Sequence, residues 1–341
     1  MAPHENLVIE GVPSVPAEIA TRASRYTNFR AALFTTWNPT RREMLIATRF
    51  GDTFQIHKVA APGAARTQLT FYSDSVRSAF YPPKVAAGTG DSFVFSKDIG
   101  GGEYYQLYRY DVATGAVTLL TDGKSRNTDE IWSHDGAKLA YGSTKRNGND
   151  VDIWITDPWH PETAKLVVQN AGGGWGPADF SPDGSQLLLT EYVSANESNL
   201  YVANLTTGEK TQITPPQLGG KDAASISQKI AYGGAAFTRD GKGVYLTTDK
   251  DSEFQRLAYF DLGRIYADQN RNQEAIAAFE RAVKLDPSQP DAHYRLARLY
   301  TLVGQKQKAA EEFAKTKELH SKTEDSLIQK VSGDAAPAPQ Q

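Results

Sequence analysis

A unit of about 50 residues recurs between residues 27 and 262, and this repeat limits the possible folds more than any other feature. Each copy opens with an aromatic residue, a turn with Pro or Asp-Gly, and a β-rich run. Each copy then continues as strand, short turn and strand, as in QLYRYDVATGAVTLLT from Gln106. The opening segments are WNPTRREMLIAT from Trp37, WSHDGAKLAYGS from Trp132, FSPDGSQLLLTE from Phe180, FTRDGKGVYLTT from Phe237 and a looser copy from Tyr81.

Four short strands per copy, at spacings of 44 to 57 residues, predict the blades of a β-propeller. The pattern supplies about four and a half blades, so we expect a partial β-propeller over residues 27–254. The blade motif resembles the TolB-type, WD-like repeat. The stretch from ENLVIEGVP through FVFSKDIGGGEYYQLYRYD to TTDKDSEFQRLAYFDL resembles the N-terminal propeller of the prolyl oligopeptidase family of serine peptidases.

The resemblance implies a propeller that gates substrate entry to an α/β-hydrolase domain. The nucleophile motif of such a domain, Gly-x-Ser-x-Gly, does not occur in this sequence. Only about 80 residues follow the propeller, which is too few for a hydrolase domain. We therefore expect no catalytic residues and no enzyme activity of the chain's own.

A second period, of 34 residues, begins where the first one ends, and it is typical of tetratricopeptide repeats. We expect two repeats and a capping helix over residues 255–331, the cap being formed by residues 323–331. An extended N-terminal segment (1–26) and a disordered tail (332–341) would complete this multidomain β plus α architecture. The matching positions are Tyr259, Leu262, Gly263, Tyr266, Ala275, Phe279, Ala282 and Pro287, followed by His293, Leu296, Ala297, Tyr300, Ala309, Phe313 and Thr316.

The two repeat systems overlap in the segment DSEFQRLAYFDLGRIYADQN, which spans residues 251–270. Residues 256–262 have the pattern of a third blade strand, whereas residues 259–270 have that of a first repeat helix. We predict a helix from about residue 255, with Ser252 and Gln255 as a capping box, because residues 263–275 lack β-branched alternation. The fifth blade would then keep two strands. Either the helices and residues 1–26 cover the exposed blade faces, or the chain joins two unrelated coding segments.

Composition excludes several classes of function. The net charge of −3 gives no basic field for nucleic acid, and the absence of cysteine removes thiolate chemistry and Cys-ligated metals. The six histidines are scattered without metal-ligand spacing, so we expect no metal and no cofactor. No apolar run reaches the length of a membrane span or signal peptide. We expect a cytoplasmic protein, or a periplasmic or secreted one if a leader has been removed.

One candidate binding site follows from the 34-residue spacing. Arg264 and Arg298 occupy equivalent positions on adjacent repeats, with Phe260 and Tyr294 one turn away. Two guanidinium groups flanked by aromatic rings suit a peptide with an acidic C-terminus. The alternative is that both arginines are solvated surface residues paired with Asp261, Asp268 or Asp291.

Two functions remain open at this point. The first is a non-catalytic scaffold that binds protein or peptide through the propeller surface and the helical-repeat groove. The second is a truncated or chimeric prolyl oligopeptidase-family chain that retains only the substrate-gating propeller.

Overall fold

The structure, a computed structural model, describes residues 8, 10, 11, 13, 14, 16–27, 29–76, 78–85, 89–215 and 229–333, with the backbone alone from residue 323 onward. The chain divides into two compact units. Unit 1 comprises Met1–Tyr81 with Thr89–Leu119, and unit 2 comprises Pro82–Gly88 with Leu120–Gln341.

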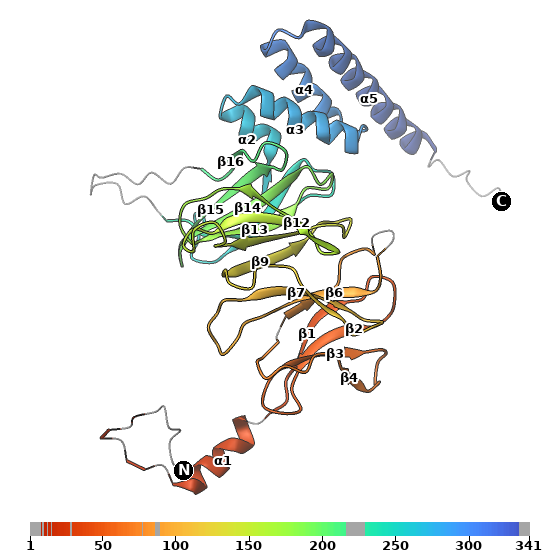
Figure 1. The fold of residues 1–341 in the computed structure, drawn as a ribbon. Helices are drawn as coiled ribbons and strands as arrows, with labels where there is room; N and C mark the ends of the chain where they lie inside the picture. Colours follow the sequence, from red (N-terminus) through yellow and green to blue (C-terminus); the bar gives the residue numbers. More distant parts are fainter. Residues whose placement is uncertain are drawn as a thin grey trace, which may run out of the picture. The chain divides into compact units, whose positions relative to one another are not determined.

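The β part forms five antiparallel sheets, which we call blades 1 to 5 (Figure 1). Four blades have four strands each, and blade 5 has three. The strands of unit 1 are β1 (Ala32–Trp37), β2 (Met44–Thr48), β3 (Gln55–Val59) and β4 (Arg66–Gln68) in blade 1, and β5 (Ser78–Phe80), β6 (Ser92–Lys97), β7 (Gln106–Asp111) and β8 (Val117–Leu119) in blade 2. The strands of unit 2 are β9 (Asn127–Trp132), β10 (Leu139–Ser143), β11 (Asp152–Asp157) and β12 (His160–Val168) in blade 3, β13 (Trp175–Phe180), β14 (Gln186–Ser194), β15 (Glu197–Asn204) and β16 (Lys210–Gln212) in blade 4, and β17 (Tyr232–Phe237), β18 (Gly243–Thr248) and β19 (Arg256–Asp261) in blade 5.

Four helices follow blade 5 in unit 2: α2 (Leu262–Asp268), α3 (Asn272–Leu285), α4 (Pro290–Leu302) and α5 (Lys306–Gly333). One hydrophobic cluster runs from blade 4 through blade 5 into these helices, from Leu188 and Leu246 to Tyr266, Phe279 and Ala309. The helices therefore share a core with the last two blades and do not form a separate core of their own.

The predicted helix from residue 255 is wrong. Residues Arg256–Asp261 form β19, which pairs residue for residue with β18, so that Phe260 lies opposite Val244 and Ala258 opposite Leu246. Pairing with the preceding strand, β18, outweighs the helical composition of the residues that follow. Blade 5 consequently has three strands and not the two that we expected.

The strand gives way to the helix at one residue, Asp261. Its backbone is extended (φ −81°, ψ 111°), and its side chain accepts a hydrogen bond from the backbone N–H of Arg264 at 2.8 Å. This is N-cap geometry, which satisfies one of the free N–H groups of the first helical turn. The predicted capping box at Ser252 does not cap a helix, because Ser252 lies in the turn before β19.

The two ends of the chain also differ from the prediction where they are described. Part of the segment expected to be extended is a helix, α1 (Ala17–Thr27), whose composition favours helix over an extended chain. The predicted capping helix at 323–331 is the continuation of α5, since no helix breaker interrupts residues 306–333. Most of the predicted tail, residues 334–341, lies outside the described residues.

The Asp-Gly turns of the blades are held by their aspartates. In blade 3, Asp135 accepts hydrogen bonds from the Ser133 hydroxyl at 2.6 Å and from the Ala137 N–H at 3.0 Å. The Ser133 bond, followed by the Ala137 bond, lowers the pKa of Asp135 below its ordinary value of 3.8. In blades 4 and 5, Asp183 and Asp240 accept from Ser181 and Thr238 in the same way.

We expect Asp135→Ala to lower the free energy of unfolding by about 1 kcal/mol at pH 7. Because the folded-state pKa is depressed, this contribution is present above the unfolded-state pKa and is lost as the pH falls through the folded-state value. Urea unfolding at pH 7 and at pH 3 should therefore show a deficit that shrinks in acid. Glu162→Ala, an exposed carboxylate in the same blade, is the matched control; an equal effect of both substitutions would contradict the role of the turn.

Candidate functional site

The helical repeats begin with a tight helix pair. Gly263 of α2 faces Phe279 of α3 so closely that a Cβ atom at residue 263 would lie 2.3 Å from the ring. Phe279, Tyr266 and Leu262 are buried in the cluster shared with the blades. Glycine at this position therefore allows α2 to pack directly on the aromatic ring of α3.

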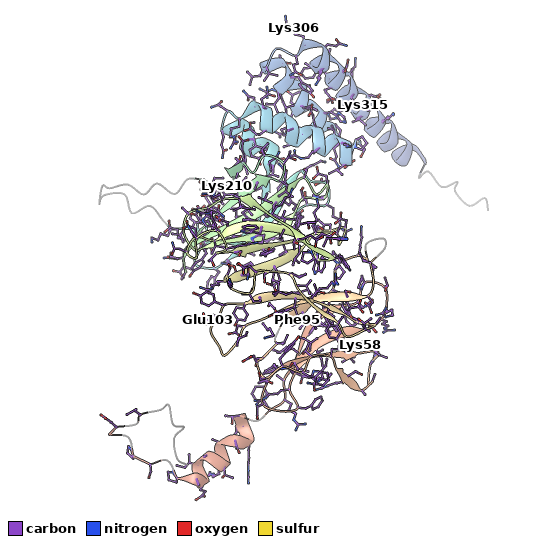
Figure 2. The ribbon with its side chains drawn as sticks, viewed as in Figure 1. Lys58, Phe95, Glu103, Lys210, Lys306 and Lys315 are labelled. Carbon is purple, nitrogen blue, oxygen red and sulfur yellow. The ribbon has the colours of Figure 1, made fainter. Side chains whose placement is uncertain are left out.

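The third and fourth helices extend the array. Pro290 lies in the first turn of α4, where its missing N–H costs nothing. His293 of α4 is buried, its Nε2–H donates to the carbonyl of Pro287 at 3.1 Å, and its Nδ1 lies 2.5 Å from a carboxylate oxygen of Glu312 on α5. These bonds attach the start of α4 to both the preceding loop and α5. Figure 2 shows the side chains of this part, with Lys306 and Lys315 labelled on α5.

A cavity of about 610 Å³ opens on the helices and contains both arginines that the sequence singled out. Arg264 comes from α2 and Arg298 from α4, and both side chains line this one cavity. A third arginine, Arg295, lies beside them. The remaining lining residues are Ala267, Asp268, Phe279, Leu299, Thr301, Leu302 and Phe313.

The three guanidinium groups differ in their partners. Arg295 donates to the Asp291 carboxylate at 2.8 Å, one helical turn away. The side chains of Arg264 and Arg298 are exposed and have no hydrogen-bond or ion-pair partner within the part of the chain that the structure describes. Of the aspartates named in the alternative, Asp291 pairs with Arg295. Asp261 accepts a hydrogen bond from the backbone N–H of Arg264 and interacts with its guanidinium group at longer range.

The cavity carries a net positive charge from three arginines against Asp268. Asp261 lies close enough for Arg295 and Arg264 to favour its charged form. Burial nevertheless dominates and raises the pKa of Asp261 above its ordinary value.

The two aromatic residues predicted beside the arginines behave differently. Phe260 does not line the cavity, because it belongs to β19 and its ring meets that of Tyr232 edge-on at 6.1 Å. The prediction of Phe260 failed together with the predicted helix start. Tyr294 meets Phe313 edge-on at 6.0 Å, and Phe313 is the ring that lines the cavity.

Arg295 and Phe313 were missed as site residues by the sequence analysis. Arg295 lies three residues before Arg298, on the same face of α4, and this spacing was a usable signal. Phe313 was assigned to the repeat core from its position in the 34-residue period. Its placement at the cavity depends on how α5 packs on α4, which the period alone does not specify.

The described residues contain neither a candidate metal site nor a candidate membrane-spanning helix. Across the described ranges, no three His, Asp or Glu side chains gather as potential metal ligands. Within the same ranges, no helix has the length and hydropathy needed to cross a membrane.

Comparisons with known proteins agree with the two repeat systems. The model of the TPR repeat family matches residues 263–304, which confirms the helical-repeat prediction. The chain is 29% identical over 138 residues to the uncharacterized peptidase YuxL of Bacillus subtilis (strain 168), a match that covers 40% of this chain and 18% of that protein. It is 26% identical over 181 residues to dipeptidyl-peptidase 5 of Porphyromonas gingivalis, covering 50% of this chain and 23% of that one. Each match thus spans less than a quarter of the relative's length.

A solved structure shows the same fold at lower identity. A prolyl endopeptidase aligns over 72% of this chain and 37% of its own length, with a TM-score of 0.52 and 15% identity. TolB from Acinetobacter baumannii aligns over 68% of this chain and 50% of its own length, with a TM-score of 0.43 and 17% identity. The protein has a propeller-like β part that resembles the propeller of prolyl endopeptidase, followed by a TPR region. The described residues form blades and helices and include no hydrolase domain.

Proposed function

We propose that this chain is a non-catalytic scaffold that binds the acidic C-terminus of a peptide or protein in the cavity of its helical repeats. The presence of a TPR repeat points to protein binding in general. The observation that carries the finer proposal is the pair of guanidinium groups, Arg264 and Arg298, that line one cavity without partners among the described residues.

The chemistry of the cavity suits a terminal carboxylate attached to an apolar side chain. A guanidinium group binds a carboxylate through two parallel N–H···O bonds, and each hydrogen bond to a charged group contributes about 1.5–3 kcal/mol. Phe313 and Leu302 are exposed apolar residues of the same lining and offer contact to the side chain of the last ligand residue. Asp268 would repel the ligand carboxylate and orient it toward the arginines.

The expected result is that Arg264→Ala and Arg298→Ala each weaken binding of an acidic peptide with a free C-terminus about tenfold or more. Fluorescence anisotropy with labelled peptides measures this, and peptides of the same sequence with an amidated C-terminus should bind the wild type weakly. Lys317→Ala removes the same charge from α5 outside the cavity and serves as control. Equal affinity of the wild type and both arginine variants, or no binding by any of them, would remove the site.

The likeness to two peptidases favours a second candidate function. In this alternative, the blades would gate substrate for a hydrolase domain, as propellers of the resembled family do. Hydrolysis of peptide p-nitroanilides by the purified chain, alone or with a candidate partner that carries a hydrolase domain, distinguishes the two candidates. Activity in either assay would support the gating function over the scaffold.

A further inference from the structure

Blades 1, 3 and 4 each have one face that packs against the next blade of the same unit, and the strand registers identify the central positions of this face. They are Leu45 and Ile56 in blade 1, Ala140 and Ile153 in blade 3, and Leu188 and Leu200 in blade 4. All six side chains are completely buried. In blades 1, 3 and 4 this face is thus covered within the same compact unit.

The same register positions in blade 5 are Tyr245 and Leu257, with Tyr259 beside them on the same face. Their exposed fractions are 50%, 75% and 46%. The helices pack in the same hydrophobic cluster as the opposite face of blade 5, which carries Val244, Leu246 and Phe260. They do not cover the face that carries Tyr245, Leu257 and Tyr259. A hollow of about 630 Å³ lies on it, lined by Thr238, Arg239, Asp240, Tyr245 and Tyr259. The expectation that the helices cover the last blade face is therefore wrong for this side.

The contacts between the other consecutive blades show which element packs on such a face. In the three junctions that lie within one unit, the first strand of the following blade packs on the preceding blade: β5 on β1 and β2, β13 on β9, β10 and β11, and β17 on β13, β14 and β15. The aromatic residue at the end of the arriving strand is buried in two of these junctions, as Tyr81 after β5 and Phe180 in β13, and half-buried in the third, as Phe237 in β17. A covered blade face in this molecule therefore packs against the first strand of the next blade and the aromatic residue at the end of that strand.

Among the blades that the structure describes, β1 is a first strand with no described blade before it. Its terminal aromatic residue, Trp37, is 58% exposed, and Leu33 and Phe34 on the same strand are also exposed. The Phe34 and Trp37 rings lie 5.6 Å apart and form a small apolar patch. Helix α1, which precedes β1, buries none of its residues, so it does not supply the missing cover.

We propose that copies of this chain associate head to tail, with β1 of one copy packed on the face of β17–β19 in another. Both halves of the contact are present in every chain, and each repeats a packing that the chain uses internally. Charge favours this pairing over one between two β1 surfaces. Residues 29–50 carry four arginines against one glutamate, a net charge of +3, whereas residues 237–261 carry four basic and five acidic side chains, a net charge of −1.

A head-to-tail contact uses two different surfaces, so one substitution on either surface is sufficient to break it. Leu257→Glu and Trp37→Glu should each weaken self-association by roughly two orders of magnitude, because each introduces a carboxylate where an apolar side chain would be buried. Both residues are largely exposed in the single chain, so neither change disturbs its core. Ile99→Glu, at a loop residue with 76% exposure, is the matched control and should leave association unchanged.

The test is sedimentation velocity from 1 to 100 µM, an experimental range chosen to span typical moderate affinities. The wild type and Ile99→Glu should sediment as concentration-dependent oligomers, and the two other variants as monomers. A mixture of Leu257→Glu with Trp37→Glu should form a dimer and nothing larger, because one intact copy of each surface remains. A monomeric wild type, association that persists in either variant, or a mixture that stays monomeric would each overturn the proposal.

The absence of cysteine from the sequence permits a second, direct measurement. Chains with Leu257→Cys and chains with Trp37→Cys should form a mixed disulfide-linked dimer under mild oxidation, faster than either chain forms one with itself. A partner copy that met a different surface would give equal rates for all three products, which would contradict the head-to-tail contact.

Discussion

Phe279→Ala is expected to lower the free energy of unfolding by about 3–5 kcal/mol, the range for removing a buried phenylalanine from a packed core. Phe279 is buried between α2 and the cluster that continues into blades 4 and 5. Because that cluster is continuous, the loss should not be confined to the helices. Blade 5 should become less stable as well, since Leu246 and Val244 belong to the same core.

Hydrogen exchange measured by mass spectrometry shows whether the loss of stability is confined to the helices or extends to blade 5. In Phe279→Ala, peptides that contain β18 should lose protection together with peptides from α2 and α3. Phe254→Ala, the same chemical change at an exposed residue of the turn before β19, should alter neither. If α2 and α3 lose protection while β18 keeps that of the wild type, the helices form an independent domain and the shared core has no energetic role.

The parts of the fold that follow from local period were predictable from the sequence. The blades were found from recurring aromatic and Asp-Gly positions, and the helical repeats from the 34-residue spacing. The boundary between blade 5 and the helices was not predictable, because residues Arg256–Asp261 carry a pattern compatible with both strand and helix. The choice is made by pairing with β18, a contact between segments that the local pattern does not encode.

The sequence predicted two arginines of the candidate site but not Phe313, an aromatic residue that lines it. Equivalent positions in adjacent repeats become neighbours in space, and this placed Arg264 and Arg298 together in one cavity. Phe260 was misassigned because the helix was started too early, and Phe313 was missed because its place depends on the packing of α5. Residue spacing predicts which side chains share a helix face, whereas the cavity is closed by contacts between helices.

Gly263→Ala is expected to destabilise the protein by about 1–3 kcal/mol, even though alanine is the better helix former. The new methyl group would lie 2.3 Å from the Phe279 ring, closer than any real contact, so the ring or helix α2 must move. The effect should change sign when Phe279 is alanine. In that background the methyl group enters the space that the ring has left, and replacing a helical glycine stabilises by roughly 0.5–1 kcal/mol.

A double-mutant cycle over Gly263→Ala and Phe279→Ala measures this coupling by urea unfolding of the four proteins. The double variant should be more stable than the sum of the two single effects predicts, by about 1.5–4 kcal/mol. Gly304→Ala, at the positive φ of 80° after α4, provides a comparison in which strain is intrinsic to the backbone. The cost of Gly304→Ala should be the same whether residue 279 is phenylalanine or alanine. If the effects of Gly263→Ala and Phe279→Ala were additive, α2 would not pack on α3 through this ring.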